Sequence, residues 1–320
     1  MSTPKTAVVF DTNSYRNLVL GKPIADILTE IQTIRAKESV KNIAAFGSQV
    51  VGMEMLANLA EGPAGFNYAD CLNGVIAMAH HCYDDAGVAP RIIPHPYLHI
   101  TRSFFGVVPP VIEQRSKNLG GVIADFKVNY TTAETHHQSS NTFQDIKNYI
   151  DKEETDFSTN ITDLIDGARQ EILHKHPRIA PKQLRTKLLD YIDNGPFEPF
   201  VAMAIVYAVA QTLQMTLPQQ DGIKKAFSLN VNFPLSVGFY TWISHKIVAD
   251  NIDMQSKASK EKRWNWRWDY EVSFLISDHT IDQREIILVT ADGDMTERLQ
   301  EFGYTNRVMT LPEYLSFLDS

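Results

Sequence analysis

Cysteines and long apolar runs are scarce in this chain of 320 residues. Cys71 and Cys82 are its two cysteines, and the segment between them has helical spacing. A helix would hold them about three turns apart, roughly 16 Å, which is too far for a disulfide. We therefore expect a reduced, intracellular and cytoplasmic protein.

No segment is long and apolar enough to predict a membrane span. The most apolar one, residues 200–215, is shorter than the ~20 residues that cross a bilayer and contains Gln211. It predicts a buried helix, and we expect no membrane association. Residues 1–5 lead directly into a short apolar run, which predicts that no signal peptide is present.

Several common catalytic patterns are missing as well. The sequence has no glycine-rich phosphate loop and no nucleophile-elbow serine. Its ten histidines include His95 and His99, but these fall in a proline-rich segment that we expect to be a loop, whereas a zinc site of this spacing requires a helix. The net charge of −8 argues against a protein that coats nucleic acid over its whole surface, although a local basic patch is compatible with it.

What the sequence does contain is an apolar run that ends in polar residues near each end of the chain. Residues 7–10 read AVVF and are followed by Asp11-Thr12-Asn13, and residues 286–289 read IILV and are followed by Thr290-Ala291-Asp292-Gly293-Asp294. Both runs predict buried strands. In an open α/β sheet, ligands bind beyond the carboxyl ends of the strands, where these acids would lie. The alternative is that each aspartate only caps the helix that follows.

The middle of the chain has helical patterns and few strand patterns. After the Gly62-Pro63-Ala64-Gly65 boundary, the apolar spacing predicts helices over residues 68–83, 111–131, 143–174, 181–192, 200–215 and 235–248. Residues 89–110 and 132–142 are expected to be loops. We therefore predict a discontinuous α/β domain, residues 1–62 and 264–320, interrupted by an all-helical insertion, residues 63–263.

A basic and aromatic stretch precedes the last part of the chain. Residues 257–268 read KASKEKRWNWRW, and cations next to aromatic faces are what a single-strand nucleic-acid surface requires. The other interpretation is a solvated charge run whose tryptophans fill the core. The residues that would contact nucleic acid are Lys260, Lys262, Arg263, Trp264, Trp266 and Arg267.

Taken in order, four motifs resemble those of the PIN-domain nucleases. They are VVFDTN with Asp11 and Asn13, SQVVGMEMLANL with Glu54, RWDYEVSFLI with Asp269 opening a helix, and IILVTADGDM with Thr290, Asp292 and Asp294. Without the resemblance, Glu54 between two methionines would simply lie on the wet side of an amphipathic helix. The resemblance implies a PIN-like three-layer α/β fold with a parallel central sheet, here carrying a large helical insertion that PIN domains do not usually have.

The resemblance also implies a site and a reaction. Asp11, Glu54, Asp269 and Asp292 would form an all-oxygen site, which selects Mg²⁺ or Mn²⁺ over zinc. Asp294 would contribute through water, and Asn13 and Thr290 would orient their neighbours. The implied function is an endoribonuclease that cleaves single-stranded RNA, with single-stranded DNA as the other substrate, in a toxin-like or defence setting or in RNA processing. An inhibitor protein or a second copy of the chain is the implied protein partner.

Three alternatives remain open from the sequence. Asp278 can replace Asp269, because the separation of Asp269 from Asp292 is longer than is usual in the family. A haloacid-dehalogenase-like phosphatase shares a first motif like VVFDTN, but it usually has a second aspartate where this chain has Asn13. Finally, the acids can be structural in a non-catalytic PIN-like module that binds nucleic acid or protein.

Overall fold

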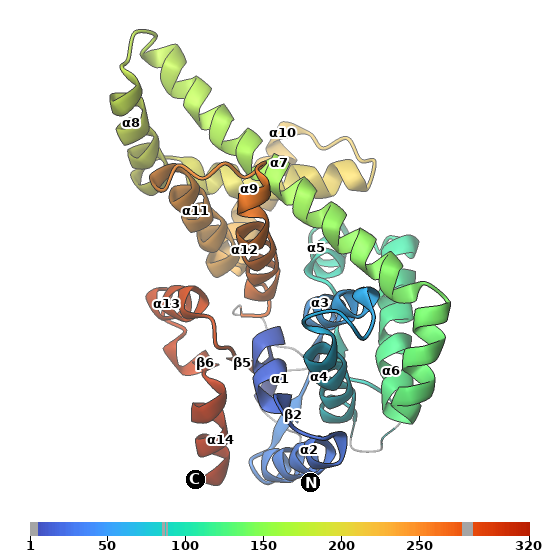
Figure 1. Ribbon diagram of the computed structural model, residues 1–320. Helices are drawn as coiled ribbons and strands as arrows, with labels where there is room; N and C mark the ends of the chain where they lie inside the picture. Colours follow the sequence, from blue (N-terminus) through green and yellow to red (C-terminus); the bar gives the residue numbers. More distant parts are fainter. Residues whose placement is uncertain (1–5, 85–86, 88, 277–283) are drawn as a thin grey trace. The chain divides into compact units, whose positions relative to one another are not determined.

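The computed structural model describes residues 6–84, 87, 89–276 and 284–320 and shows a mixed α/β protein in which helices predominate (Figure 1). The chain forms two compact units. The sheet unit comprises residues 1–99, 108–150 and 279–320, and the helical unit comprises residues 100–107 and 151–278. The α/β class expected from the sequence is confirmed.

A parallel sheet with the strand order β2-β1-β5-β6 organises the sheet unit. Its central pair aligns Thr6 of β1 with Glu285 of β5 and Phe10 with Val289. Residues 7–10 are fully buried, as expected for a parallel strand that is covered on both faces. The strands are β1 (Thr6–Phe10), β2 (Ile43–Ala45), β5 (Glu285–Val289) and β6 (Val308–Met309).

Helices and a second, two-stranded sheet complete the sheet unit. One of these helices, α4, packs against α1, α2, α3 and α6. Both cysteines are free and buried, Cys71 within α4 and Cys82 just after it, as the spacing predicted. The elements are α1 (Thr12–Val19), α2 (Ile24–Val40), β3 (Gly47–Ser48), α3 (Gln49–Asn58), η1 (Leu59–Glu61), α4 (Tyr68–His81), β4 (Ile92–Ile93), α6 (Pro110–Ser139), α13 (Gly293–Glu301), η3 (Thr305–Arg307) and α14 (Leu311–Asp319).

The helical unit packs around aromatic side chains. Phe157, Tyr240, Tyr270 and Phe274 form successive ring contacts, with centroid distances of 5.6, 5.2 and 5.3 Å. Two helices belong to both units: α5 and α7 each begin in the sheet unit and continue into the helical one. The elements are α5 (Pro96–Phe105), α7 (Thr142–Lys175), α8 (Pro181–Asn194), α9 (Phe197–Thr212), α10 (Gln219–Asn232), α11 (Pro234–Ala249), η2 (Lys257–Ser259) and α12 (Lys260–Ser273).

The boundaries differ from those expected. Described residues of 63–99 and 108–150 group with the sheet unit, because α4 and α6 pack on its helices, whereas residues 264–276 group with the helical unit. Both expected loops are wrong in part. Residues 96–105 form α5, and α6 continues to Ser139. The backbone of α6 breaks at Asn129, whose side chain then accepts a hydrogen bond from Thr132 N at 3.0 Å and caps the continuation.

The apolar segment at residues 200–215 lies within α9 and the turn that follows it, close to the predicted helix. Among the described residues, no helix combines the length and apolar character that crossing a bilayer requires.

Candidate functional site

Asp11 lies where β1 ends and α1 begins. Its Oδ1 accepts a hydrogen bond from Ser14 N at 2.6 Å, which caps α1, and its Oδ2 accepts one from Thr290 Oγ1 at 2.6 Å. Burial raises the pKa of Asp11, and these hydrogen bonds only partly oppose the shift. Its donors are all neutral hydroxyl and backbone N–H groups, so they leave the negative charge of this half-buried carboxylate uncompensated.

Asp292 occupies the equivalent position after β5. It caps α13, with Oδ1 accepting from Met295 N at 2.6 Å. Its own backbone N donates to Thr290 Oγ1 at 3.0 Å. The Thr290 hydroxyl therefore joins the two strand ends, because it receives a bond from Asp292 and donates one to Asp11. Asp294 lies two residues further on, exposed in the first turn of α13.

Glu54 reaches the same place from α3. Its Oε2 accepts a hydrogen bond from Thr12 Oγ1 at 2.6 Å, and Thr12 directly follows Asp11. Glu54 is half-buried and is therefore not simply a solvated residue on the wet side of the helix. Asn13 is exposed in the first turn of α1. Within the sheet unit, the Thr290 hydroxyl thus links the Asp11 carboxylate to the backbone of Asp292, and the Thr12 hydroxyl links Glu54 to the residue that directly follows Asp11.

The topology explains why these residues meet. The chain leaves β1 and returns as β2 on one side of it, whereas β5 pairs with its other side. The order of the strands therefore reverses between β1 and β5, and the carboxyl ends of the two strands flank that switch point. Ligands of open parallel sheets bind at such positions. Ser14 supports the pair, because its Oγ donates to the Val289 carbonyl at 2.9 Å.

The four-acid cluster expected from the sequence is not found in the part of the chain that the structure describes. There, no group of three or more His, Cys, Asp or Glu side chains is arranged to hold a metal ion. Asp269 belongs to the helical unit. It lies in the last third of α12, not in a first helical turn as expected, because the helix already begins at Lys260. Asp278 lies outside the described residues.

The basic and aromatic stretch contributes largely to the core of the helical unit, and the nucleic-acid interpretation is wrong for its buried members. Trp266 and Arg267 are only 9% and 7% exposed. Arg267 forms ion pairs with Glu271 and with Glu153 of α7, the latter at 3.2 Å. Lys260 and Lys262 are exposed, with their ammonium groups over the rings of Trp264 and Trp266.

Arg263 from the same stretch is also committed to the protein. Its Nη1 donates to the backbone carbonyls of Met254 at 2.8 Å and Ser256 at 2.6 Å. These bonds fix the turn that precedes α12. The alternative in which the tryptophans fill the core therefore describes most of this segment, and the cations that it offers to solvent are Lys257, Lys260 and Lys262.

A buried polar network, which the sequence did not indicate, lies beside the candidate site. Tyr15 is on α1, one turn after Asp11, and its Oη lies 3.0 Å from His81 Nδ1 and 3.1 Å from Cys82 Sγ. His81 Nε2 lies 3.0 Å from Glu38 Oε1, which also accepts from Tyr314 Oη at 2.7 Å. Burial alone would lower the pKa of His81, but the Glu38 carboxylate, together with the Cys82 side chain, raises it to about 10.

No protein-family model matches the chain, and neither a curated protein nor a solved structure matches it.

Proposed function

We propose that the protein is a nuclease that depends on Mg²⁺ or Mn²⁺ and carries its active site at the carboxyl ends of β1 and β5, in a PIN-like sheet. The observation that carries the proposal is the joining of Asp11 and Asp292 through the Thr290 hydroxyl at the switch point, with Glu54 attached through Thr12. Asp269 is in the other unit, and the proposal does not depend on it.

The donor set suits a hard cation. Mg²⁺ retains several waters and is commonly bound by one or two protein carboxylates together with substrate phosphates. A site with two strand-end aspartates and a nearby glutamate meets that requirement without a cage of three protein ligands. Asp11 adds a second reason, because burial raises the pKa of this carboxyl and its hydrogen-bond donors carry no positive charge. A bound cation would supply the charge that the protein does not.

In this proposal Asp11 and Asp292 hold the ion, and Glu54 supports the water or phosphate next to it. Thr290 fixes the spacing of the two aspartates, and the helix caps from Ser14 N and Met295 N fix their orientation. When bound, the cation activates water and stabilises the charge that develops on a phosphodiester. The substrate class comes from the order of the motifs, which resembles that of PIN-domain nucleases, with single-stranded RNA as the first substrate to test.

The test is cleavage of a labelled single-stranded RNA and its DNA equivalent with Mn²⁺, Mg²⁺ or EDTA. The wild type is compared with Asp292→Asn and with Asp26→Asn, which removes an exposed acid in the first turn of α2 in the same unit. We expect metal-dependent cutting by the wild type and Asp26→Asn and none by Asp292→Asn. Cutting that survives in Asp292→Asn would contradict the proposal.

One observation favours a second candidate, a non-catalytic PIN-like binding module. Asp11 and Asp292 each already have a structural role as the cap of a helix. If that is their whole role, millimolar Mn²⁺ leaves the melting temperature unchanged, whereas a metal site raises it. This measurement separates the two candidates even when the correct substrate is not in the assay.

A further inference from the structure

The turn that joins α7 to α8 is rich in positive charge. Residues 172–189 contain five lysine or arginine residues and two histidines but no aspartate or glutamate, in a chain whose net charge is −8. All five cations are exposed. We call residues 174–187 the basic turn; its cations are Lys175, Arg178, Lys182, Arg185 and Lys187.

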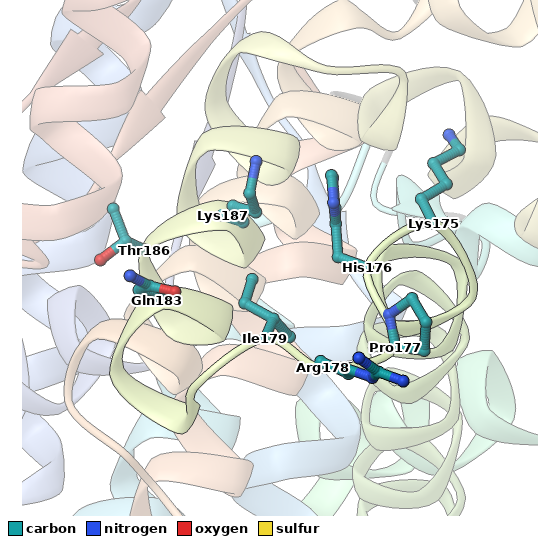
Figure 2. Close-up of a pocket in the computed structure, with 8 residues that line it drawn as sticks. All are labelled: Lys175, His176, Pro177, Arg178, Ile179, Gln183, Thr186 and Lys187. Carbon is teal, nitrogen blue, oxygen red and sulfur yellow. The ribbon is translucent and has the colours of Figure 1, made fainter.

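The basic turn surrounds a hollow of about 720 Å³. Lys175, His176, Arg178 and Lys187 line it, together with the amide of Gln183 and the hydroxyl of Thr186. Figure 2 shows the side chains of Lys175, His176 and Lys187 extending to the same side of the turn. Hydrogen-bond donors from two helices and the segment between them therefore line the hollow, together with the apolar side chains of Pro177 and Ile179.

Much of this charge is not used within the protein. Lys175 pairs with Glu171 at 2.7 Å, and Arg185 donates to the Ala249 carbonyl. Arg178 and Lys187 have neither an ion pair nor a hydrogen bond from their side chains to any described residue. The N-cap of α8, Ala180, offers no side-chain acceptor to the first turn, so the positive end of that helix adds to the same field.

We propose that the basic turn binds the phosphate backbone of a single-stranded nucleic acid. Clustered exposed cations supply the electrostatic part of such binding, and the Gln183 amide and Thr186 hydroxyl can donate hydrogen bonds to phosphate oxygens. A lipid surface fits less well, because the described large apolar side chains that are exposed include none between residues 172 and 189. The basic turn would then be where the enzyme holds its substrate strand, and this part of the proposal rests on the proposed nuclease function.

The experiment measures binding of a fluorescently labelled single-stranded RNA in EDTA, with Asp292→Asn as the parent so that no strand is cut. The test variant adds Arg178→Glu and Lys187→Glu. The matched control adds Arg102→Glu and Lys224→Glu, which reverse one arginine and one lysine that are exposed on α5 and α10 of the same unit. All variants are compared over a series of salt concentrations.

We expect the test variant to bind at least tenfold more weakly, and the control to bind within about twofold of the parent. The slope of log Kd against log salt should become shallower by about 1.4, since each phosphate contact on a single strand contributes about 0.7. Equal weakening of both variants, or unchanged binding by the test variant, would overturn the proposal. So would binding of polyglutamate in place of RNA, which would indicate an acidic protein partner.

The outcome is separable from that of the nuclease proposal. RNA binding that depends on the basic turn, without cleavage by the wild type, would support the binding surface and contradict the nuclease proposal. Metal-dependent cleavage with an unchanged KM in the variant that carries Arg178→Glu and Lys187→Glu would support the nuclease proposal and contradict the binding surface.

Discussion

The Thr290 hydroxyl connects the Asp11 carboxylate to the backbone N–H of Asp292. Replacing Thr290 by valine keeps the shape but removes the buried hydroxyl that donates to Asp11 Oδ2 and accepts from Asp292 N, and a buried polar group left without its partner costs about 1–3 kcal/mol. We expect Thr290→Val to lower the free energy of unfolding by that amount at pH 7 in urea titrations. The loss should shrink in acid, where protonated Asp11 no longer carries the charge that the hydroxyl stabilises.

Thr296→Val is the control for this prediction. The Thr296 hydroxyl donates only to the Asp292 carbonyl within its own helix, at 2.8 Å. Its loss should change the free energy of unfolding by no more than about 0.5 kcal/mol. Equal destabilisation by both substitutions would mean that the Thr290 hydroxyl has no special role between the two acids.

His81 and Glu38 predict how stability depends on pH. The Glu38 carboxylate, together with the Cys82 side chain, raises the pKa of His81 from 6.5 to about 10, despite burial. The folded protein therefore holds a proton that the unfolded chain releases above pH 6.5. The stabilisation is complete below pH 6.5 and is lost as the pH rises toward 10, at about 1.4 kcal/mol per pH unit at most.

Urea unfolding of the wild type and of His81→Gln at pH 6 and pH 9 measures this dependence. The difference in unfolding free energy between the two proteins should be larger at pH 6 than at pH 9. A difference that does not change with pH would show that His81 is neutral in the folded protein.

Helix α12 shows that a charged and aromatic segment can belong to a core. Arg267 lies between Glu271 on its own helix and Glu153 on α7. Removing one partner of a buried ionic group leaves the others uncompensated, which costs about 3–5 kcal/mol. We expect this loss for Arg267→Met in chemical denaturation, and less than about 0.5 kcal/mol for Lys262→Met on the exposed side. Similar small losses for both would mean that Arg267 is not part of the core.

The elements show which parts of the fold local sequence can predict. The strands ending at Asp11 and Asp292 were predicted because continuous apolar runs mark buried parallel strands, and the caps because Asp precedes each helix. The start of α12 was not predicted. Arg267 and Trp268 find their acidic partners, Glu153 and Glu154, on α7, which is 114 residues away in sequence. Local composition therefore indicated a solvated or nucleic-acid surface. The continuation of α6 to Ser139 was not predicted. The break and the cap at Asn129 lie within residues 111–131, where the helical spacing is continuous, so the local pattern did not indicate that a new helical stretch begins there.

At the scale of the whole molecule, the sequence predicted the discontinuous α/β organisation but not its limits. Residues 63–99 and 108–150 carry helical patterns, and nothing in those patterns shows that α4 and α6 pack with α1 and α3. The candidate site has the same limit. Asp11, Thr290 and Asp292 follow from strand ends, whereas the bond between Thr12 and Glu54 depends on how α3 packs. The charge of the basic turn was visible as a run without acids, but its exposure was not.

Metal binding should act on one unit and should depend on pH. Asp11, Glu54 and Asp292 all belong to the sheet unit. Hydrogen exchange measured by mass spectrometry should therefore show Mn²⁺-dependent protection in peptides from α1, β5 and α13, and little in peptides from α8, α9 and α10. Because burial raises the pKa of Asp11, protons compete with the metal in acid. The protection should grow as the pH rises through that pKa.

Asp11→Asn tests whether the charge of Asp11 causes the Mn²⁺-dependent protection. The amide keeps an oxygen that can accept from Ser14 N or Thr290, but it has no negative charge to hold the ion. In this variant the Mn²⁺-dependent protection should be absent at every pH, while exchange without metal stays close to that of the wild type. Protection that appears equally in both units would show that Mn²⁺ binds the surface nonspecifically. Protection confined to the sheet unit but independent of pH would show that the ion is held without Asp11. A metal site that needs this half-buried carboxylate in its charged form predicts both localisation and pH dependence, and neither follows if Asp11 is only a helix cap.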